Sequence, residues 1–230
     1  MTQPFYNEKF YDHLIEGASK SAEVYLGALF ALWSPASIID LGCGRGAWLA
    51  VANRLGIRRL VGIDGGWVAP QELVCPAMEF HSADLNDPVD QPETFDLALS
   101  LEVAEHLRPE SSEIFIASLT ALSNAVVFSA AFTGQPGTNH INTRPHSFWA
   151  ERFTARGFHL FDFFRPRFWS DDRVEPWYRQ NTFIYVRPDH VLHDALGAAG
   201  YVPLHDLHFV DCVHPWFYLE ALKQVQPTQI

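Results

Sequence analysis

Residues 40–46, with the sequence Asp-Leu-Gly-Cys-Gly-Arg-Gly, place three alternating glycines directly after an acidic side chain. Glycine carries no side chain, so a loop of this kind can turn tightly and lets a ligand approach its backbone. A tight turn between a strand and a helix, without any ligand, would use the same glycines. The dinucleotide-binding pattern G-x-G-x-x-G needs its third glycine at position 47, which is Ala47 here, so a nicotinamide cofactor is a distant alternative.

Two further groups of titratable side chains have types that suit acid–base chemistry. Glu102, Glu105 and His106 lie within five positions of one another, and His140 lies in a loop rich in Gly, Pro, Thr and Asn. Carboxylates and imidazoles are common general bases, which remove a proton from a reacting hydroxyl. We therefore expect His140, Glu102 and His106 to be catalytic, and for His106 a structural role in the pocket wall is the alternative. For His140 the alternative is a loop histidine that only hydrogen-bonds to the backbone.

These residues follow the ends of expected strands, which short apolar runs predict and helical stretches separate. We expect strands at 37–41, 59–64, 78–81, 95–100 and 124–132, and a closing antiparallel hairpin of 158–164 with 182–186. We expect helices at 8–33 (divided at Gly17), 46–55, 111–122, 147–156 and 191–199.

The alternation of strands and helices indicates an α/β fold, with a parallel sheet covered by helices on both faces. Ligands bind such sheets at the carboxyl ends of the strands, where the glycine loop and the acidic residues fall. We expect one globular unit with an N-terminal helical cap at 1–36, a core at 37–187 and a C-terminal extension at 188–230.

The composition limits the function classes. The net charge is −11, which repels phosphate backbones, so we expect no nucleic-acid partner. The three cysteines, Cys43, Cys75 and Cys212, are odd in number and widely spaced, which favours a reducing cytosol. We find neither a signal-peptide pattern at the N-terminus nor an apolar run long enough for a membrane span. We expect a cytoplasmic protein that acts on a small molecule.

The order of these motifs resembles the class I S-adenosylmethionine-dependent methyltransferases. Residues 40–46 resemble their first motif, Asp64 ends the second expected strand, Asp84 follows the third, and the run at 102–107 follows the fourth. The resemblance spans roughly residues 37–186. It implies a Rossmann-like sheet of seven strands, mostly parallel, with one strand reversed at the edge and helices on both sides.

The resemblance also implies S-adenosylmethionine as the cofactor. Asp64 would accept hydrogen bonds from both ribose hydroxyls, the region of Asp84 would contact the adenine, and Asp40 would face the ammonium group or orient the loop. A carboxylate suits a diol because each oxygen accepts a strong hydrogen bond. The expected cofactor-binding residues are Asp40, Gly42, Cys43, Gly44, Gly46, Asp64, Gly65, Asp84, Leu85 and Leu101.

The stretch from Thr138 to Trp149 resembles bacterial small-molecule and glycan-associated methyltransferases, which carry a His-x-Asn loop before a Trp-containing helix. This resemblance implies that His140 is the general base and that Asn142, Arg144 and Trp149 bind the acceptor. We expect no metal, because the tail's His, Asp and Cys residues match no metal-binding spacing and the paired Asp pattern of Mg²⁺-dependent members is missing.

We predict transfer of a methyl group to a hydroxyl of a natural product or a sugar-containing molecule. One alternative is N-methylation of an amine, which Glu102 and Glu105 would favour by attracting a cationic acceptor. The other is a catalytically inactive cofactor-binding protein that works through a partner bound to its aromatic tail. The sequence leaves a homodimer open.

Overall fold

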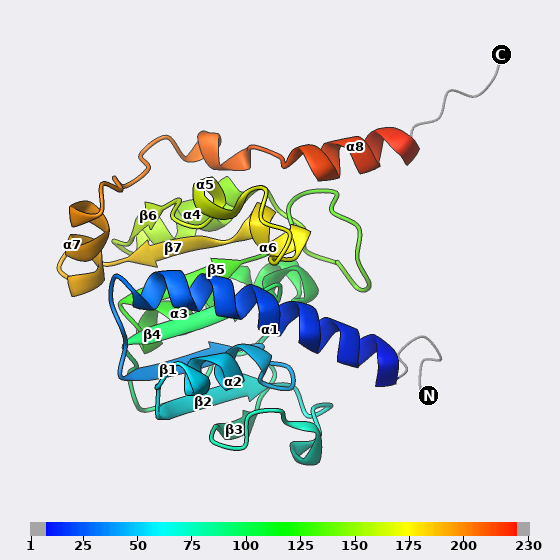
Figure 1. The fold of residues 1–230 in the computed structure, drawn as a ribbon, viewed down its shortest axis with the longest axis vertical. Helices are drawn as coiled ribbons and strands as arrows, with labels where there is room; N and C mark the ends of the chain where they lie inside the picture. Colours follow the sequence, from blue (N-terminus) through cyan, green and yellow to red (C-terminus); the bar gives the residue numbers. More distant parts are fainter. Residues whose placement is uncertain (1–7, 225–230) are drawn as a thin grey trace.

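A seven-stranded sheet forms the centre of the molecule, with the strand order β3-β2-β1-β4-β5-β7-β6 (Figure 1). The computed structural model describes residues 8–224, with side chains from 15 to 223. The strands are β1 (Ser37–Leu41), β2 (Arg59–Asp64), β3 (Glu79–Ser82), β4 (Leu97–Leu101), β5 (Ala125–Ser129), β6 (His159–Phe161) and β7 (Phe183–Val186). All neighbouring pairs are parallel except the two that β7 makes. The Rossmann-like, mostly parallel sheet predicted from the sequence is confirmed.

The reversed strand β7 lies inside the sheet, so its expected place at the edge is wrong. It pairs with β5 on one side and with β6 on the other. All four residues of β7 are buried, and a strand covered on both faces satisfies its backbone groups best between two neighbours. The three-residue β6 takes the edge instead. Because β7 runs backwards, its first residues lie at the same edge as the last residues of β4 and β5.

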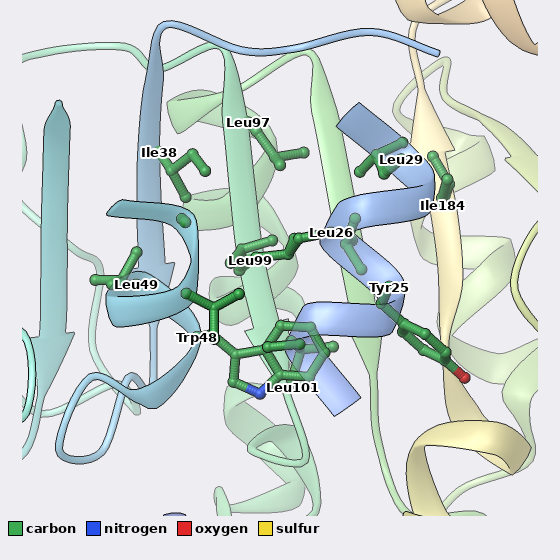
Figure 2. Packing of buried hydrophobic residues seen from close by; sticks show 14 of the residues in the cluster. Tyr25, Leu26, Leu29, Ile38, Trp48, Leu49, Leu97, Leu99, Leu101 and Ile184 are labelled. Carbon is green, nitrogen blue, oxygen red and sulfur yellow. The ribbon is translucent and has the colours of Figure 1, made fainter. Parts of the chain in front are cut away.

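Helices cover both faces, because successive strand residues point to opposite sides of the sheet. Ile38 belongs to the apolar cluster that contains residues of α1 (Glu8–Phe30), α2 (Ala47–Arg54) and α7 (Val191–Ala198). The next residue, Ile39, belongs to the cluster on the other face with α3 (Ser112–Leu122) and α4 (His146–Ala155). Figure 2 shows the first cluster, in which Leu29 of α1 lies beside Ile184 of β7 and Leu26 of α1 lies beside Leu99 of β4.

The first helix is continuous through Gly17, where the sequence analysis expected a division. Ser21 Oγ donates to the Gly17 carbonyl oxygen at 2.8 Å within this helix, and the Glu175 side chain packs on the side of Gly17 that a Cβ would occupy. The helix is a full layer of the core, because Tyr25, Leu26 and Leu29 are completely buried. Residues 1–7 of the expected N-terminal cap lie outside the described residues.

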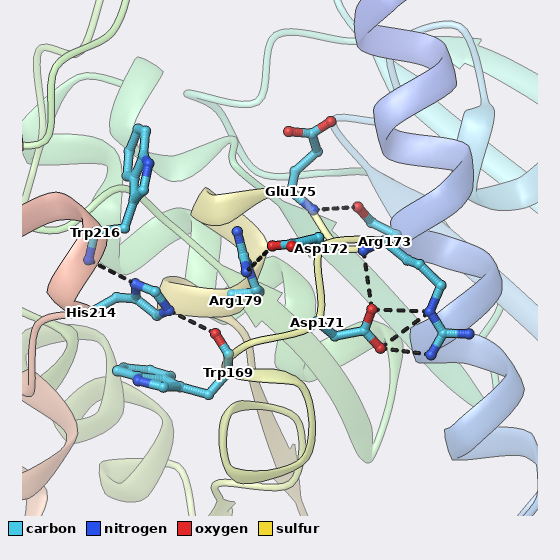
Figure 3. A network of polar contacts seen from close by, with 9 residues as sticks. Trp169, Asp171, Asp172, Arg173, Glu175, Arg179, His214 and Trp216 are labelled. Atoms are coloured by element: carbon cyan, nitrogen blue, oxygen red, sulfur yellow. Dashed lines mark hydrogen bonds and ion pairs between the residues drawn. The ribbon is translucent and has the colours of Figure 1, made fainter.

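The C-terminal extension packs along the sheet and ends in a helix that the sequence analysis did not predict. The remaining helical segments are α5 (Arg165–Phe168), α6 (Pro176–Asn181), α8 (Pro215–Gln224) and the short 3₁₀ turns η1 (Pro70–Glu72), η2 (Ala104–His106), η3 (Pro109–Ser111) and η4 (Leu207–Asp211). The extension is tied down by His214, whose Nε2 lies 2.7 Å from the Trp169 carbonyl oxygen and whose Nδ1 accepts from the Trp216 N–H at 3.0 Å (Figure 3). Among the described helices, none is long and apolar enough to cross a bilayer.

Candidate active site

A cavity of about 750 Å³ opens at the edge of the sheet where β1, β4 and β5 end. The segments around β1 and β2 contribute Asp40, Gly42, Cys43, Gly44, Arg45, Ala47, Trp48, Trp67, Val68 and Glu72 to its lining. The segments around α1, β4, β5 and α6 contribute Ile15, Ala18, Leu101, Glu102, Glu105, His106, Gln135, Pro136, Gly137, Thr138, His140, Trp177 and Tyr178. The volume suits a cofactor-sized ligand, and open α/β sheets bind ligands at this edge.

The glycine loop turns from β1 into α2 through left-handed backbone conformations. Gly42, Gly44 and Gly46 have φ angles of 85°, 52° and 85°, which residues with a Cβ adopt only at a cost. The N–H groups of Gly42 and Cys43 donate to the Ile63 carbonyl oxygen at 2.7 and 3.2 Å, so β2 supports the loop. Of the loop residues predicted to bind the cofactor, only Gly46 does not line the cavity, because it faces Met78 below the loop.

Asp40 is a buried carboxyl group that lines the cavity without a hydrogen-bond partner among the described residues. It is 2% exposed, and no described side chain or backbone group donates to it. Burial, together with the nearby charge of Asp64, raises the pKa of Asp40 to about 8. An unpaired buried carboxyl is costly unless a ligand supplies a positive charge or a donor. Asp40 therefore fits the ammonium group of an amino-acid ligand.

Asp64 holds the glycine loop and does not line the cavity. Its Oδ2 accepts from the Gly44 N–H at 2.7 Å, and its Oδ1 accepts from the Gly65 N–H at 2.6 Å. Burial raises the pKa of Asp64, and these two hydrogen bonds oppose that shift. Each carboxylate oxygen can still accept a second hydrogen bond, so the predicted ribose contact is compatible with this arrangement.

The expected adenine contacts after β3 do not lie at the cavity. Asp84 is exposed, and its Oδ1 accepts from the backbone and side-chain amides of Asn86 at 2.9 and 2.8 Å. Leu85 is buried in the core on the α3 side of the sheet. Gly65 is covered by the ring of Trp67, which is 81% exposed and lines the cavity itself. Leu101, at the end of β4, does line the cavity, as expected.

Glu102 follows β4 and has a left-handed backbone conformation. Its φ angle of 58° is uncommon for a residue with a side chain, and such strain often marks functional sites. Asn181 Nδ2 donates to both Glu102 carboxylate oxygens at 3.0 and 3.1 Å, and Gln135 Nε2 donates at 3.4 Å. Burial raises the pKa of Glu102, and the Asn181 hydrogen bonds act in the opposite direction.

Glu105 is completely buried beside the Glu102 carboxyl, and neither of its carboxylate oxygens makes a hydrogen bond of normal geometry with the described residues. Burial, and then the charge of Glu102, raise the pKa of Glu105 well above its ordinary value. The backbone carbonyl oxygen of Glu105 accepts two hydrogen bonds, from the N–H groups of Ile141 and Asn142 at 2.9 Å each. These two bonds fasten the loop after β5 to the turn after β4.

That fastening brings His140 next to His106. The two ring centroids are 5.0 Å apart in an edge-on arrangement. His106 Nδ1 lies 3.3 Å from the Asn139 carbonyl oxygen, and His140 Nδ1 lies 3.1 Å from the Gln135 carbonyl oxygen. Burial and the neighbouring His140 lower the pKa of His106. The three residues predicted to be catalytic, Glu102, His106 and His140, therefore meet at the cavity.

A family model for the methyltransferase domain matches residues 22–206, which is most of the chain. The chain belongs to this methyltransferase family. The cofactor predicted from the sequence, S-adenosylmethionine, follows from that membership, and the cavity fits it through the glycine backbone and the unpaired Asp40. A search of curated proteins found no match to this methyltransferase.

Solved structures with the same fold include several methyltransferases. CalS10, an amino pentose methyltransferase from Micromonospora echinaspora, aligns with 15% identity and a TM-score of 0.57, over 81% of this chain and 99% of that chain. DesVI from Streptomyces venezuelae aligns with 12% identity and a TM-score of 0.59, over 78% and 96%. Magnesium protoporphyrin IX methyltransferase from Synechocystis aligns with 17% identity and a TM-score of 0.53, over 81% and 90%. At these identities the likeness shows the fold of the methyltransferase alone.

The expectation that Trp149, Asn142 and Arg144 bind the acceptor needs correction, since none of them lines the cavity of the methyltransferase. Trp149 is 1% exposed and packs against Phe128 and Phe148 in the core. Asn142 is buried, and its Nδ2 donates to the Ala104 carbonyl oxygen and to Ser112 Oγ at 3.2 and 3.0 Å. Arg144 donates to Asn142 Oδ1 at 2.9 Å. Asn142 therefore holds the loop that carries His140.

Sequence reasoning missed several residues that shape the cavity of the methyltransferase. Asn181 and Gln135 hold Glu102, and Tyr178 forms part of the wall together with Trp48, whose Nε1 donates to the Tyr178 hydroxyl at 3.4 Å. Trp48 lies both in the core and at the cavity.

Proposed function

We propose that this methyltransferase methylates a hydroxyl group of a small-molecule or sugar-containing acceptor. The observation that carries the proposal is the placement of His140 at the cavity. Its Nδ1 is held by the Gln135 carbonyl oxygen, and no hydrogen bond from the described residues reaches its Nε2. An imidazole held in this way has one nitrogen available to take a proton from an acceptor hydroxyl.

When it is bound, S-adenosylmethionine supplies an electrophilic methyl group on a sulfonium ion. Transfer of this methyl group to the acceptor oxygen would leave S-adenosylhomocysteine as the second product. His140 Nε2 takes the hydroxyl proton, and the turn that carries Glu105 fixes the loop of His140 in place. The wall of Trp177 and Tyr178 would position the rest of the acceptor.

The same proposal assigns the cofactor to the other residues of the cavity. Asp40 would bind the ammonium group, and the backbone at Gly42, Cys43 and Gly44 would face the methionine portion. Asp64 would accept the ribose hydroxyls with its remaining lone pairs. We no longer propose Asp84 and Leu85 as cofactor contacts, because neither lines the cavity.

The acceptor class rests on two supports. The cavity combines aromatic walls with polar groups, which suits a ligand with both apolar and hydroxyl parts. The solved structures with this fold include an amino pentose methyltransferase and a magnesium protoporphyrin IX methyltransferase, whose substrates are small molecules. We propose the cytoplasm as the compartment, because Cys43, Cys75 and Cys212 are all unpaired thiols.

N-methylation of an amine is the second candidate function. Glu102 and Glu105 place one half-buried and one fully buried carboxyl group at the cavity, and a carboxylate attracts a cationic acceptor. This candidate needs the carboxyl groups to be ionised and gives His140 a smaller part, because a neutral amine can attack without a base.

One experiment separates the candidates. The purified chain would be incubated with S-adenosylmethionine and a panel of sugars, phenols and amines, and the methylated products would be identified by mass spectrometry. Products methylated on oxygen, lost in His140→Ala, would support the proposal. Products methylated only on nitrogen would replace it with the second candidate. Tight binding of S-adenosylhomocysteine without any turnover would favour a catalytically inactive binding protein.

A further inference from the structure

The Glu105 carboxyl group is buried at the cavity and makes no hydrogen bond of normal geometry with the described residues. A buried carboxyl group normally has hydrogen-bond donors or a cation beside it. Glu105 is 0% exposed and lines the cavity, and neither carboxylate oxygen makes a hydrogen bond of normal geometry with the described residues. The N–H groups of Glu105 and Ala131 and the Glu102 carboxyl lie near enough to affect its pKa. The second carboxyl group at the cavity, Glu102, is satisfied by Asn181, so the lack of a normal hydrogen bond belongs to Glu105 alone of the two.

The imidazoles of His106 and His140 lie close to the Glu105 carboxyl group. Glu105, His106 and His140 each offer one ligand atom, and these atoms all lie within 4.8 Å of one another. They come from two parts of the chain, the turn after β4 and the loop after β5, which the Glu105 carbonyl oxygen joins through the N–H groups of Ile141 and Asn142. The cluster is therefore held together by the backbone and does not depend on side-chain contacts alone.

Each imidazole is also oriented by a carbonyl oxygen. His106 Nδ1 lies 3.3 Å from the oxygen of Asn139, and His140 Nδ1 lies 3.1 Å from the oxygen of Gln135. An Nδ1–H that donates to a carbonyl leaves the lone pair on Nε2, which is the arrangement of metal-binding histidines in proteins. Gly137 allows this position for His140, because a Cβ at Gly137 would collide with the ring at Cε1 and Nε2.

From these observations we propose that Glu105, His106 and His140 bind one divalent transition-metal ion at the acceptor part of the cavity. Two imidazole nitrogens and one carboxylate suit Mn²⁺, Fe²⁺, Co²⁺ or Zn²⁺, whereas Mg²⁺ and Ca²⁺ prefer oxygen ligands alone. Three protein ligands leave positions open for water or an acceptor oxygen. This proposal replaces the expectation from the sequence that no metal binds.

The catalytic use of this ion rests on the proposed function. An acceptor hydroxyl that coordinates the ion becomes more acidic, because the positive charge stabilises the oxygen anion. Its proton leaves to water, and the oxygen forms its bond to the methyl carbon as the sulfur–carbon bond breaks. In the metal-bound state His140 is a ligand through Nε2, and the ion takes over from the imidazole the task of activating the hydroxyl.

The test is calorimetric titration of the metal-free full chain with MnCl₂, CoCl₂ and ZnCl₂. We expect one ion per chain, and we expect Glu105→Gln and His140→Ala each to weaken binding by about tenfold or more. The matched control is His81→Ala, which removes an exposed histidine that is paired with Glu79 on the edge strand β3. The control should bind the ion like the wild type.

Two further variants keep the test decisive if Glu105→Gln does not fold. His106→Gln removes an exposed ligand, and Gly137→Ala displaces the His140 ring without removing any ligand. Both should weaken binding, and bound Co²⁺ should show a visible absorption band that these variants lose. No stoichiometric binding of any of the three ions, or binding that all these variants retain, would overturn the proposal.

A separate titration with S-adenosylhomocysteine keeps the two proposals apart. A chain that binds S-adenosylhomocysteine but no metal would keep the methyltransferase function and lose the metal site. A chain that binds the metal, and yet methylates amines alone, would keep the site and lose the hydroxyl acceptor.

Discussion

The side-chain amide of Asn181 donates to both carboxylate oxygens of Glu102, at 3.0 and 3.1 Å, and joins the end of α6 to the end of β4. The same amide also donates to Gln135 Oε1 at 3.0 Å. Three segments far apart in the sequence thus meet at one amide group. This contact fixes a carboxylate at the wall of the cavity, where the strained backbone of Glu102 presents it.

We expect Asn181→Ala to destabilise the protein and to slow methyl transfer. Removal of the amide leaves the buried Glu102 carboxylate without its main donor, which costs about 2 kcal/mol for a charged group. The free energy of unfolding in urea measures the first effect. Glu102→Gln in the Asn181→Ala background removes the unpaired charge, so it should recover part of the lost stability. No recovery would mean that the charge of Glu102 is not what Asn181 stabilises.

Asp64→Ala should weaken S-adenosylhomocysteine binding by about tenfold, or about 1.4 kcal/mol. The variant loses the hydrogen bonds that hold the Gly44 and Gly65 N–H groups, and with them the proposed ribose contact. Calorimetric titration is the measurement. The control is Asp84→Ala, an exposed carboxylate outside the cavity, for which we expect a change within about twofold. An equal loss of S-adenosylhomocysteine affinity in the two variants would support the expected contact between Asp84 and the adenine.

Asp40→Asn should weaken cofactor binding and make the free protein more stable in alkaline conditions. The pKa of Asp40 is about 8 in the folded chain against an ordinary value of 3.8. Between these values the folded state holds a proton that the unfolded state has lost, so this group lowers the free energy of unfolding as the pH rises. The Asp40→Asn variant removes that slope.

Urea unfolding of both proteins at pH 5 and pH 8 measures this effect. The gain of Asp40→Asn over the wild type should be larger at pH 8, and the same variant should bind S-adenosylhomocysteine more weakly. A gain that is equal at the two pH values would show that Asp40 is already ionised in the folded chain at pH 5.

His140→Ala should lower kcat by about 100-fold at saturating acceptor and leave S-adenosylhomocysteine binding unchanged. The variant removes the general base of the metal-free protein, which contributes about that much, or a ligand of the proposed ion. The acceptor is the one that the screen above identifies. Ile141→Ala is the control, since Ile141 is the next residue on the same loop and is 57% exposed. Near-normal turnover in His140→Ala, with or without added metal, would remove His140 from the reaction.

The strands and the glycine loop could be predicted because their signals are local. The apolar runs at 37–41 and 59–64 gave the observed bounds of β1 and β2, and the glycine spacing placed the loop between β1 and α2. The four residues Asp40, Gly42, Cys43 and Gly44 that line the cavity were predicted from the resemblance of this loop to the first motif of the methyltransferases. Periodicity and glycine spacing are properties of neighbouring residues, so the sequence displays them directly.

The polar contacts of the site could not be predicted, because they depend on the sheet topology. Asn181 reaches Glu102 because β7 runs antiparallel beside β5, inside the sheet. The sequence had predicted the reversed strand at the edge of the sheet. The position of Trp149 in the sequence fits a buried helix face as well as a ligand contact, and in the structure Trp149 packs in the core. His140 lies next to His106 because the Glu105 carbonyl oxygen accepts hydrogen bonds from the loop of His140, and no sequence pattern predicts these hydrogen bonds.

The contact between α1 and α6 has a consequence for how such an enzyme can diversify. Glu175 directly precedes α6, and its N–H donates to Ser21 Oγ of α1 at 3.0 Å. Both helices also line the cavity, through Ile15 and Ala18 and through Trp177 and Tyr178. Substitutions along the first helix would therefore reshape the acceptor wall while the glycine loop stays intact, so substrate range and methyl-donor use can evolve separately.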